Sequence, residues 1–482
     1  MRKVIEYLIQ AGGKKKECLE VDNPYKEIGF DSEKPRLGWV KIPSWIMIKN
    51  LLTKCLEFIK DKEKFIFVGM GGSINGVKTL SFLNGKFIYP LDSLDPFALK
   101  EVLDKIDDFK KVFVIAISKS GTTKETQLIA LTLKEAISCK LYSSSGKSNN
   151  WRKHFLWLTD SESFENLNSL GWEGVPKLPI QVDGGSDIGG RFSSPHTLVF
   201  LLPLFLILGK DFNRLKEIYD SYLSLRGDIL NKAYDLAHRY KNLPHAYFAI
   251  KVKNKLLNNF STWLIQLFQE SLGSKKKNFG VKTIVVEKIR EDSFYPLSLY
   301  EMIENPISYV MLMMSCLQYF VAFYSYFKKI NFVNQPFVEE YKRKMKILDR
   351  EGIVSPQEVN LKKLIEEVGR NINPNHKFIE IVLYFYPQRS SLIAEIAREF
   401  GKKFPSKKIF VFLGSDWNHH SYQSAFWDEE TLYVLLISRN YTTHIPFISK
   451  ESLENNIDTL KKISFATFIT LKNKSLYFSL DY

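Results

Sequence analysis

The feature that most constrains the fold is a series of short apolar runs, each followed by a loop of small residues and then by a helical pattern. The run KFIFVG at 64–69 leads into Gly69-Met70-Gly71-Gly72-Ser73 and a helix through Leu83. The run KVFVIAI at 111–117 leads into a loop rich in Ser and Thr and a helix to about Ile137. We expect further strands at 139–143 and 154–158. Strand–loop–helix units in series predict a parallel sheet with helices on both of its faces.

A second set of such units follows a helical stretch over 196–240. A strand is expected at 245–251, a helix at about 254–269 and another strand at 281–287. The next run, from Asn305 to Phe327, has no charged residue and is long enough to cross a bilayer. It contains four tyrosines, three serines and Gln318, which lower its preference for lipid, so we expect a buried central helix.

The last part of the chain has a different order of elements. Strands are expected at 378–386, 408–413, 431–438 and 475–480, and helices at 389–402 and 449–462. The order β-α-β-β-α-β predicts a small α+β domain of the ferredoxin-like type. The predicted division is a helical segment at 1–60, doubly wound α/β domains at 61–205 and 206–346, and the α+β domain at 347–482.

Net charge and cysteine content limit the class of protein. The 482 residues include 68 Lys and Arg against 53 Asp and Glu, a formal charge of +15. Such an excess suits nucleic acid, an anionic membrane surface or small anionic substrates. No nucleic-acid motif accompanies the charge, so we expect neither nucleic acid nor membrane as a partner. The four cysteines form no CxxC pair or zinc spacing, which favours a reducing cytoplasm.

The two loops that follow the first strands are candidate phosphate sites. Free backbone N–H groups and the positive end of a helix attract phosphate at such loops, and hydroxyl groups add further donors. Ordinary capping of a helix needs only one such side chain. No GxxxxGK[ST] pattern occurs, so an NTPase P-loop is not indicated. The candidate residues are Gly71, Gly72 and Ser73 in the first loop and Ser118, Lys119, Ser120, Thr122 and Thr123 in the second.

Four motifs in order along the chain resemble those of the phosphoglucose isomerase family, whose members have the sugar-isomerase (SIS) fold. They are SKSGTTKET from Ser118, GGRFS from Gly189, QLFQESLG from Gln266 and NQPFVEEYK from Asn334. The resemblance implies two SIS domains over about 60–345 and an enzyme that interconverts glucose 6-phosphate and fructose 6-phosphate. It also implies a homodimer that needs no cofactor. The apolar helix followed by an extra domain is similar to the isomerase half of transaldolase–phosphoglucose isomerase fusions.

The chemistry of this reaction assigns roles to residues in the motifs. A carboxylate with a pKa tuned by burial suits proton transfer between C2 and C1, and Glu270 is the candidate. Arg191, which follows Gly190, would stabilise the negative charge of a cis-enediol intermediate. Gln266, one helical turn before Glu270, would orient substrate or base. In the resembling family the counterpart of Gln335 lies near the phosphate, and that of Lys342 points at the ring oxygen.

The sequence departs from the family pattern in two places. The family's ring-opening His follows the base by about 30 residues, but no His lies between His245 and His376. That stretch offers Asp292, Ser293, Tyr295 and Tyr300 instead, and a second departure is a Ser inserted at 274 where the family has Gly-Lys. A degraded C-terminal motif, FLGSDWNHHSYQ from Phe412, contains His420 and Gln423, and we expect His420 to open the ring. The alternative is that the reaction starts from open-chain sugar and needs no ring-opening residue.

Two alternatives stay open at this point. One is dual activity on glucose 6-phosphate and mannose 6-phosphate. The other is a sugar-phosphate-binding regulatory module without catalysis, a hypothesis motivated by the missing His and the degraded motif. Glu270 and Arg191 argue against the regulatory module, because binding alone needs neither.

Overall fold

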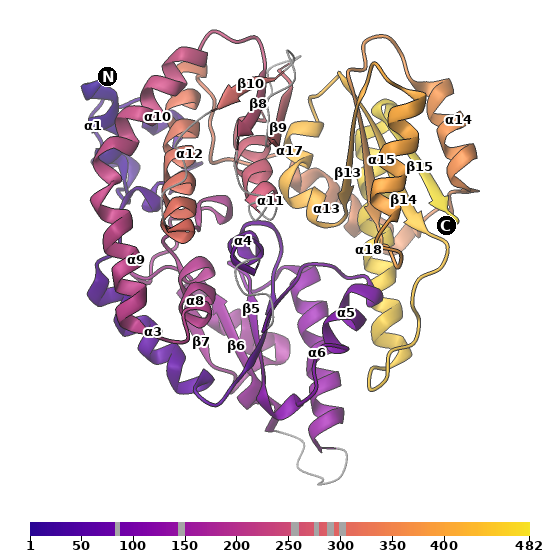
Figure 1. The fold of residues 1–482 in the computed structure, drawn as a ribbon, viewed down its shortest axis with the longest axis horizontal. Helices are drawn as coiled ribbons and strands as arrows, with labels where there is room; N and C mark the ends of the chain where they lie inside the picture. Colours follow the sequence, from indigo (N-terminus) through magenta and orange to yellow (C-terminus); the bar gives the residue numbers. More distant parts are fainter. Residues whose placement is uncertain (82–86, 143–149, 252–259, 274–278, 287–293, 298–304) are drawn as a thin grey trace.

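Parallel β-sheets organise the part of the chain that the computed structural model describes, which is residues 1–482 without 82–86, 143–149, 252–259, 274–278, 287–293 and 298–304. Three such sheets are present in these ranges, along with the short antiparallel pair β1 (Phe30–Asp31) and β2 (Lys34–Pro35). Figure 1 shows the first sheet at the bottom, the second at the top centre and the third at the right.

The first sheet has the order β4-β3-β5-β6-β7, and all of its pairings are parallel. Alternation along β3 sends Phe65 and Phe67 into one core and Ile66 and Val68 into another, so the sheet is covered on both faces. Its strands are β3 (Lys64–Val68), β4 (Ile88–Leu91), β5 (Val112–Ile117), β6 (Phe155–Thr159) and β7 (Lys177–Pro179). The nearby helices are α3 (Trp45–Ile59), α4 (Asn75–Ser81), α5 (Pro96–Leu103), α6 (Lys124–Tyr142) and α8 (Leu198–Ile207).

The strand predicted at 139–143 is wrong for its described residues. Positions 139–142 are the last turn of α6, and residue 143 lies outside the described ranges. No Gly or Pro interrupts 124–142, so the helix continues past the expected end at Ile137. The two strands that flank this helix, β5 and β6, fall where the sequence predicted them.

The second sheet has the order β10-β8-β9, with parallel pairing of β8 (Ala246–Lys251), β9 (Val281–Val286) and β10 (Tyr295–Leu297). The helix predicted at 254–269 is described only from α11 (Phe260–Ile265), which continues as a π-helical turn at Gln266–Glu270. Helices α9 (Phe212–Ser224), α10 (Arg226–Tyr240) and α12 (Pro306–Lys328) lie together on the left in Figure 1.

The charge-free run folds as the central helix α12, which is capped by the Asn305 side chain. Within the described ranges it is the one helix long and apolar enough to cross a membrane by length and composition, and its most apolar window is entirely buried in protein. The amide of Gln318 is buried and donates to the carbonyls of Phe192 and Ser194. This amide ties α12 to the segment before α8, whereas Gln318 Oε1, Tyr324 Oη and Ser325 Oγ are buried without a hydrogen-bond partner among the described residues.

The third sheet contradicts the ferredoxin-like assignment of the last domain. Its order is β11-β15-β14-β12-β13, and every pairing is parallel, whereas a ferredoxin-like sheet is antiparallel. Two short helices, α16 (Asp416–His420) and α17 (Tyr422–Ala425), connect β13 to β14. They make this connection a crossover, so β14 runs parallel to its neighbours. The strands are β11 (Gln357–Val359), β12 (Phe378–Tyr384), β13 (Lys408–Leu413), β14 (Thr431–Ser438) and β15 (Ser475–Leu480).

The third sheet packs against the rest of the chain through its helices and one face. The helices are α13 (Val338–Glu351), α14 (Leu361–Asn371), α15 (Leu392–Lys403) and α18 (Lys450–Leu471). One hydrophobic core runs from Ile66 in the first sheet to Val382 and Leu435 in the third. Because this core crosses the predicted boundaries, the division at 60, 205 and 346 stays a prediction.

Candidate active site

The serine- and threonine-rich loop lies between β5 and α6, at the carboxyl end of the first sheet. Two hydroxyl pairs hold its shape: Ser118 with Thr123 at 2.9 Å and Ser120 with Thr122 at 2.8 Å. Gly121 has a φ of +68°, a conformation that side chains disfavour, and its carbonyl accepts from Gln127. Such a loop before a helix presents backbone N–H groups toward an anion.

A cavity of about 450 Å³ opens beside this loop, between the start of α6, the helix α13 and the short helix α16. Lysines from two of these elements stand around it, which gives it the charge that a phosphate needs. Its lining residues are Ser120, Thr122, Thr123, Lys124, Glu125, Tyr341, Lys342, Met345, Lys346, Asp349 and His419. Residues about 300 positions apart in the sequence, such as Ser120 and His419, therefore line the same cavity.

The partly buried His419 and the buried Glu125 form a pair in the wall of this cavity. Nε2 of His419 lies 2.9 Å from Oε1 of Glu125. Burial by itself lowers the pKa of His419, but the hydrogen bond and charge of Glu125 outweigh it and raise the pKa above its ordinary value. For Glu125, burial raises the pKa, but the bond and charge of His419 bring it below the ordinary value. The carboxylate thus favours the protonated form of the imidazole, which is the form that can donate a proton to a ligand in the cavity.

Glu270 and Arg191 form a second pair, beside the cavity rather than in its wall. Nη1 of Arg191 lies 3.2 Å from Oε1 of Glu270, and both side chains are almost fully buried. Arg191 is fixed by Ser271 Oγ, which accepts at 2.7 Å, and by the Phe332 carbonyl at 2.6 Å. Burial raises the pKa of the Glu270 carboxyl, although the Arg191 charge and a hydrogen bond from Gln266 work in the opposite direction.

One oxygen of the Glu270 carboxylate is left without a hydrogen bond. Its Oε2 is buried and has no hydrogen-bond partner in the described part of the chain. A buried carboxylate oxygen without a donor is costly unless something binds there. A raised pKa and an unpartnered oxygen are the properties of a general base.

The two glycine loops pack directly on one another and on the pairs just described. A Cβ at Gly72 would lie 2.1 Å from the carbonyl carbon of Gly190 and 2.6 Å from the nitrogen of Arg191, so only glycine fits. Gly71 has a φ of +51°, and a Cβ there would lie 2.8 Å from Gln266 Nε2 and 2.9 Å from His419 Cβ. The first loop therefore joins the two pairs.

Gln266 links the second helical unit to both other sheets. Its Oε1 accepts from Asn75 at 2.8 Å, and its Nε2 donates to the His419 carbonyl at 3.0 Å. The structure thus brings Gly71, Gly72, Gly190, Arg191, Gln266 and Glu270 together, with the serine–threonine loop and Lys342 at the adjacent cavity. Lys342 is half exposed and donates to Glu339.

Other predicted site residues lie elsewhere. The Lys119 side chain turns away from this cavity, donates to the Ser186 carbonyl at 2.9 Å and lines a separate cavity of about 370 Å³. Ser73, in the turn that opens α4, and Gln335, half-buried before α13, are not among the lining residues of the 450 Å³ cavity. Asp292, Ser293 and Tyr300, considered in place of the missing His, lie outside the described residues, as does Ser274.

His420, the residue expected to open the ring, faces away from the cavity. Its ring packs against Phe412, and its Nδ1 lies 2.6 Å from Ser421 Oγ. Burial lowers its pKa to about 4, so it stays uncharged. Gln423 is also buried, with its amide donating to the Gly273 carbonyl and accepting from the Phe337 N–H.

The structure singles out Glu125 and His419, which the sequence did not. Glu125 lies inside the SKSGTTKET motif, and an acid directly after the phosphate loop was the available signal. For His419, the available signal was the adjacent pair of histidines at 419 and 420. Which of the two faces the cavity depends on the rotation of α16, because consecutive helical residues point about 100° apart.

The fold is that of the sugar-isomerase (SIS) group, with parallel-sheet α/β units and a phosphate-type loop at a carboxyl sheet edge. A solved glucose-6-phosphate isomerase from Chlamydia trachomatis aligns with 72% of this chain and 84% of its own, with a TM-score of 0.52 and 17% identity. At that identity the likeness shows the fold alone. No family model matches the chain.

The resemblance to glucose-6-phosphate isomerases that the four motifs predicted is confirmed by comparison with curated proteins. The chain is 29% identical over 246 residues to the glucose-6-phosphate isomerase of Thermus thermophilus, covering 49% of this chain and 55% of the relative. It is 30% identical over 260 residues to that of Campylobacter jejuni, covering 50% and 59%. The matches thus span a little over half the length of these relatives.

Proposed function

We propose that the chain is an aldose–ketose isomerase that interconverts glucose 6-phosphate and fructose 6-phosphate through a cis-enediol. The observation that carries the proposal is the buried Glu270 carboxylate, with one unpartnered oxygen and Arg191 at its other oxygen, next to a phosphate-type loop. The named activity of the relatives supports the same reaction.

The substrate phosphate is captured by the loop at Ser120, Thr122 and Thr123, where Lys124 and Lys342 supply positive charge. The sugar then extends past His419 toward Gly71 and Gln266, which lie against His419. Glu270 lies at the end of this direction, since it is hydrogen-bonded by Gln266 and senses the charge of His419.

His419 opens the ring in this proposal. The protonated imidazole, held by Glu125, donates a proton to the ring oxygen as the C1–O5 bond breaks. The C1 hydroxyl gives its proton to a water molecule to leave the aldehyde, and the imidazole regains a proton from solvent. Glu270 then removes the C2 proton and returns it to C1, while protons exchange between O1 and O2. Arg191 stabilises the negative charge of the enediol because its guanidinium stays protonated throughout.

The test separates the two steps. Ring opening alone interconverts the α and β anomers of glucose 6-phosphate, which exchange NMR detects, whereas proton transfer at C2 is detected as deuterium uptake from D₂O. Glu270→Gln should lower isomerisation and deuterium uptake by about 100-fold or more and leave accelerated anomer exchange in place. His419→Gln should lower the anomer exchange.

Glu399→Gln, a change in a partly exposed acid on α15 that pairs with Arg398 and Lys402, is the matched control and should change neither rate. If the pure wild-type protein binds sugar phosphate without any turnover, the chain is the regulatory module instead. Turnover of mannose 6-phosphate in the same assay would establish the dual activity. The homodimer and the cytoplasmic location expected from the sequence stay predictions.

A further inference from the structure

Residues 415–425, which we call the clasp, belong to the third sheet by connectivity and to the site by position. They contain α16 and α17 and join β13 to β14. They also contact the π-helical turn of the second unit and the first glycine loop. His419, the proton donor of the proposed reaction, is carried on α16, a helix of only five residues. Such a short helix has little stability of its own, so its neighbours must fix its orientation.

Several side chains of the clasp form hydrogen bonds or ion pairs that hold it in place. Asp416 Oδ2 lies 2.9 Å from Lys78 Nζ on α4. Asn418 accepts from Tyr384 and donates to Thr467, both at 2.7 Å. Further bonds join Ser421 to Gln269 at 2.6 Å, Gln423 to Gly273 at 3.2 Å and Ser424 to the Val281 carbonyl at 3.3 Å.

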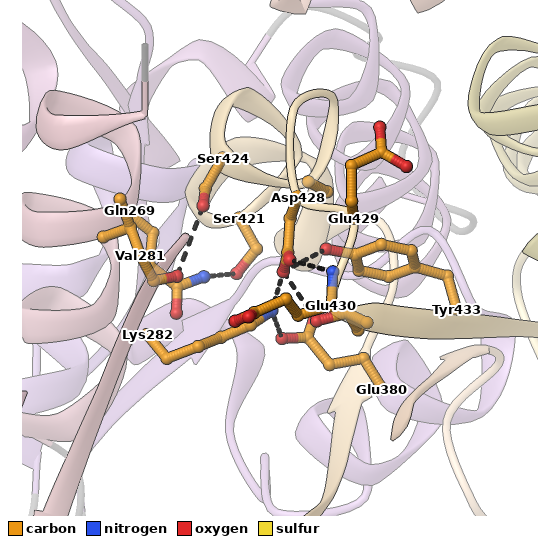
Figure 2. Close-up of polar contacts among 12 residues, drawn as sticks. Gln269, Val281, Lys282, Glu380, Ser421, Ser424, Asp428, Glu429, Glu430 and Tyr433 are labelled. Atoms are coloured by element: carbon orange, nitrogen blue, oxygen red, sulfur yellow. Dashed lines mark hydrogen bonds and ion pairs between the residues drawn. The ribbon is translucent and has the colours of Figure 1, made fainter. Parts of the chain in front are cut away.

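Close to His419, the clasp is anchored to the third sheet by Trp417. Its indole is completely buried, and Nε1 donates to Oε2 of Glu380 on β12 at 3.0 Å. The other carboxylate oxygen of Glu380 is held by Lys282 of β9, which also pairs with Asp428 at 3.0 Å. Figure 2 shows Lys282 between these two carboxylates, with Tyr433 donating to Asp428. Lys282 of the second sheet therefore holds the Glu380 carboxylate, and this carboxylate in turn holds the Trp417 indole.

This chain of contacts restricts the rotation of α16. Trp417 stands two residues before His419, so a turn of the helix that breaks the indole bond also moves the imidazole away from Glu125. A turn by one residue, about 100°, would bring His420 toward the cavity in place of His419. No part of the Lys282–Glu380–Trp417 chain is among the lining residues of the cavity.

We infer that Trp417, Glu380 and Lys282 are positioning residues that hold His419 against Glu125 for the ring-opening step. The inference rests on the proposed function for its kinetic part. It gives the third sheet a task in the reaction: its β13–β14 connection supplies the proton donor, and its strand β12 supplies Glu380, which orients that donor together with Lys282 of the second sheet. The charged groups that face His419 are Glu125 on α6, Lys342 on α13, Asp416 on α16 itself and Glu270 on the π-helical turn.

The test compares Trp417→Phe with Tyr433→Phe in the full-length chain. Each variant removes one hydrogen bond to a buried carboxylate of the same cluster, but only Trp417 belongs to the clasp. The first readout is the pKa of His419 from ¹³C-histidine NMR, with the signal assigned by its loss in His419→Gln. The second is the anomer exchange of glucose 6-phosphate, compared with deuterium uptake at C2 starting from the open-chain form.

Trp417→Phe should return the pKa of His419 to about 6.5, the ordinary histidine value, and slow anomer exchange about tenfold with a smaller effect on deuterium uptake. Tyr433→Phe should leave both unchanged. The inference is overturned if Trp417→Phe leaves the His419 pKa and the exchange rate as they are, or if both variants change them equally. Should Trp417→Phe not fold, Lys282→Met/Glu380→Leu removes the same acceptor with the net charge kept, and the same readouts decide.

The two proposals fail in distinguishable ways. If the wild-type protein neither isomerises nor exchanges anomers, the proposed function is wrong, while the NMR titration of Trp417→Phe still decides whether Trp417 positions His419. If the wild type is active and the titration is unaffected by Trp417→Phe, only the positioning inference is wrong.

Discussion

Replacing Lys282 by Met tests the buried ion pairs that join the second and third sheets. Lys282, Glu380 and Asp428 are each at most 2% exposed. At the 3.0 Å separation of Lys282 and Asp428, the attraction is about 5 kcal/mol for an effective dielectric constant of about 20. The desolvation of the lysine offsets part of this attraction. Removing one partner of a buried pair typically costs about 3–5 kcal/mol, because the other charge is left unpaired.

The expected loss can be expressed as a melting temperature. The entropy of unfolding of a 482-residue chain is about 1 kcal/mol per kelvin near its midpoint, so Lys282→Met should lower Tm by about 3–5 °C at pH 7.5. The loss should shrink as the pH falls, because the two abandoned carboxylates acquire raised pKa values and protonate in the folded state. Scanning calorimetry of wild type and variant at pH 7.5 and 5.5 measures both effects.

The double variant Lys282→Met/Glu380→Gln is the control for charge imbalance. This variant leaves one buried carboxylate, that of Asp428, which still accepts hydrogen bonds from Thr431 and Tyr433. The double variant should therefore recover part of the stability that Lys282→Met loses. A loss below about 1 kcal/mol for Lys282→Met, or a loss independent of pH, would refute the reasoning, since this cluster would then contribute no more than a typical surface ion pair.

Two further predictions concern the glycine loops and the buried histidines. Gly72→Ala should abolish isomerase turnover, because its Cβ would lie 2.1 Å from the Gly190 backbone, whereas Gly227→Ala, in open space on α10, should keep activity and raise stability by up to about 1 kcal/mol. His196 is buried and uncharged, with a pKa lowered by burial to about 3. Since His196 protonates only on unfolding, the free energy of unfolding should fall by about 1.4 kcal/mol through this residue as the pH is lowered from 7.5 to 5.5. In His196→Gln, urea titrations at the two pH values should show a pH dependence smaller by that amount.

Several elements and the loop chemistry follow from local sequence. The strands β3, β5 and β6 are continuous apolar runs, as buried parallel strands are, and their positions agree with the prediction. The central helix α12 is buried on all sides, as its tyrosines and Gln318 indicated. The Gln318 NH2 group and the hydroxyls of Ser308 and Ser315 find partners inside the protein.

The third sheet shows where local pattern fails. The sequence predicted two consecutive strands at 408–413 and 431–438, and the intervening α16 and α17 were not anticipated. Each has at most five residues, which is too short for a helical period to be recognised. Two strands with no helix between them predict a hairpin-type connection and an antiparallel sheet. Because α16 and α17 lie between β13 and β14, the connection is instead a crossover between parallel strands.

The sequence by itself determined the class of fold, the phosphate-type loop and the residues of the four motifs, because each depends on short-range spacing or on a resemblance carried by contiguous residues. Only the tertiary structure decided that Glu125 meets His419, across 294 positions, and that His420 faces away. The physical reason is that the rotation of α16 is set by the contacts of Trp417, Asp416 and Ser421 with three different sheets or their helices. No pattern within the helix itself contains that information.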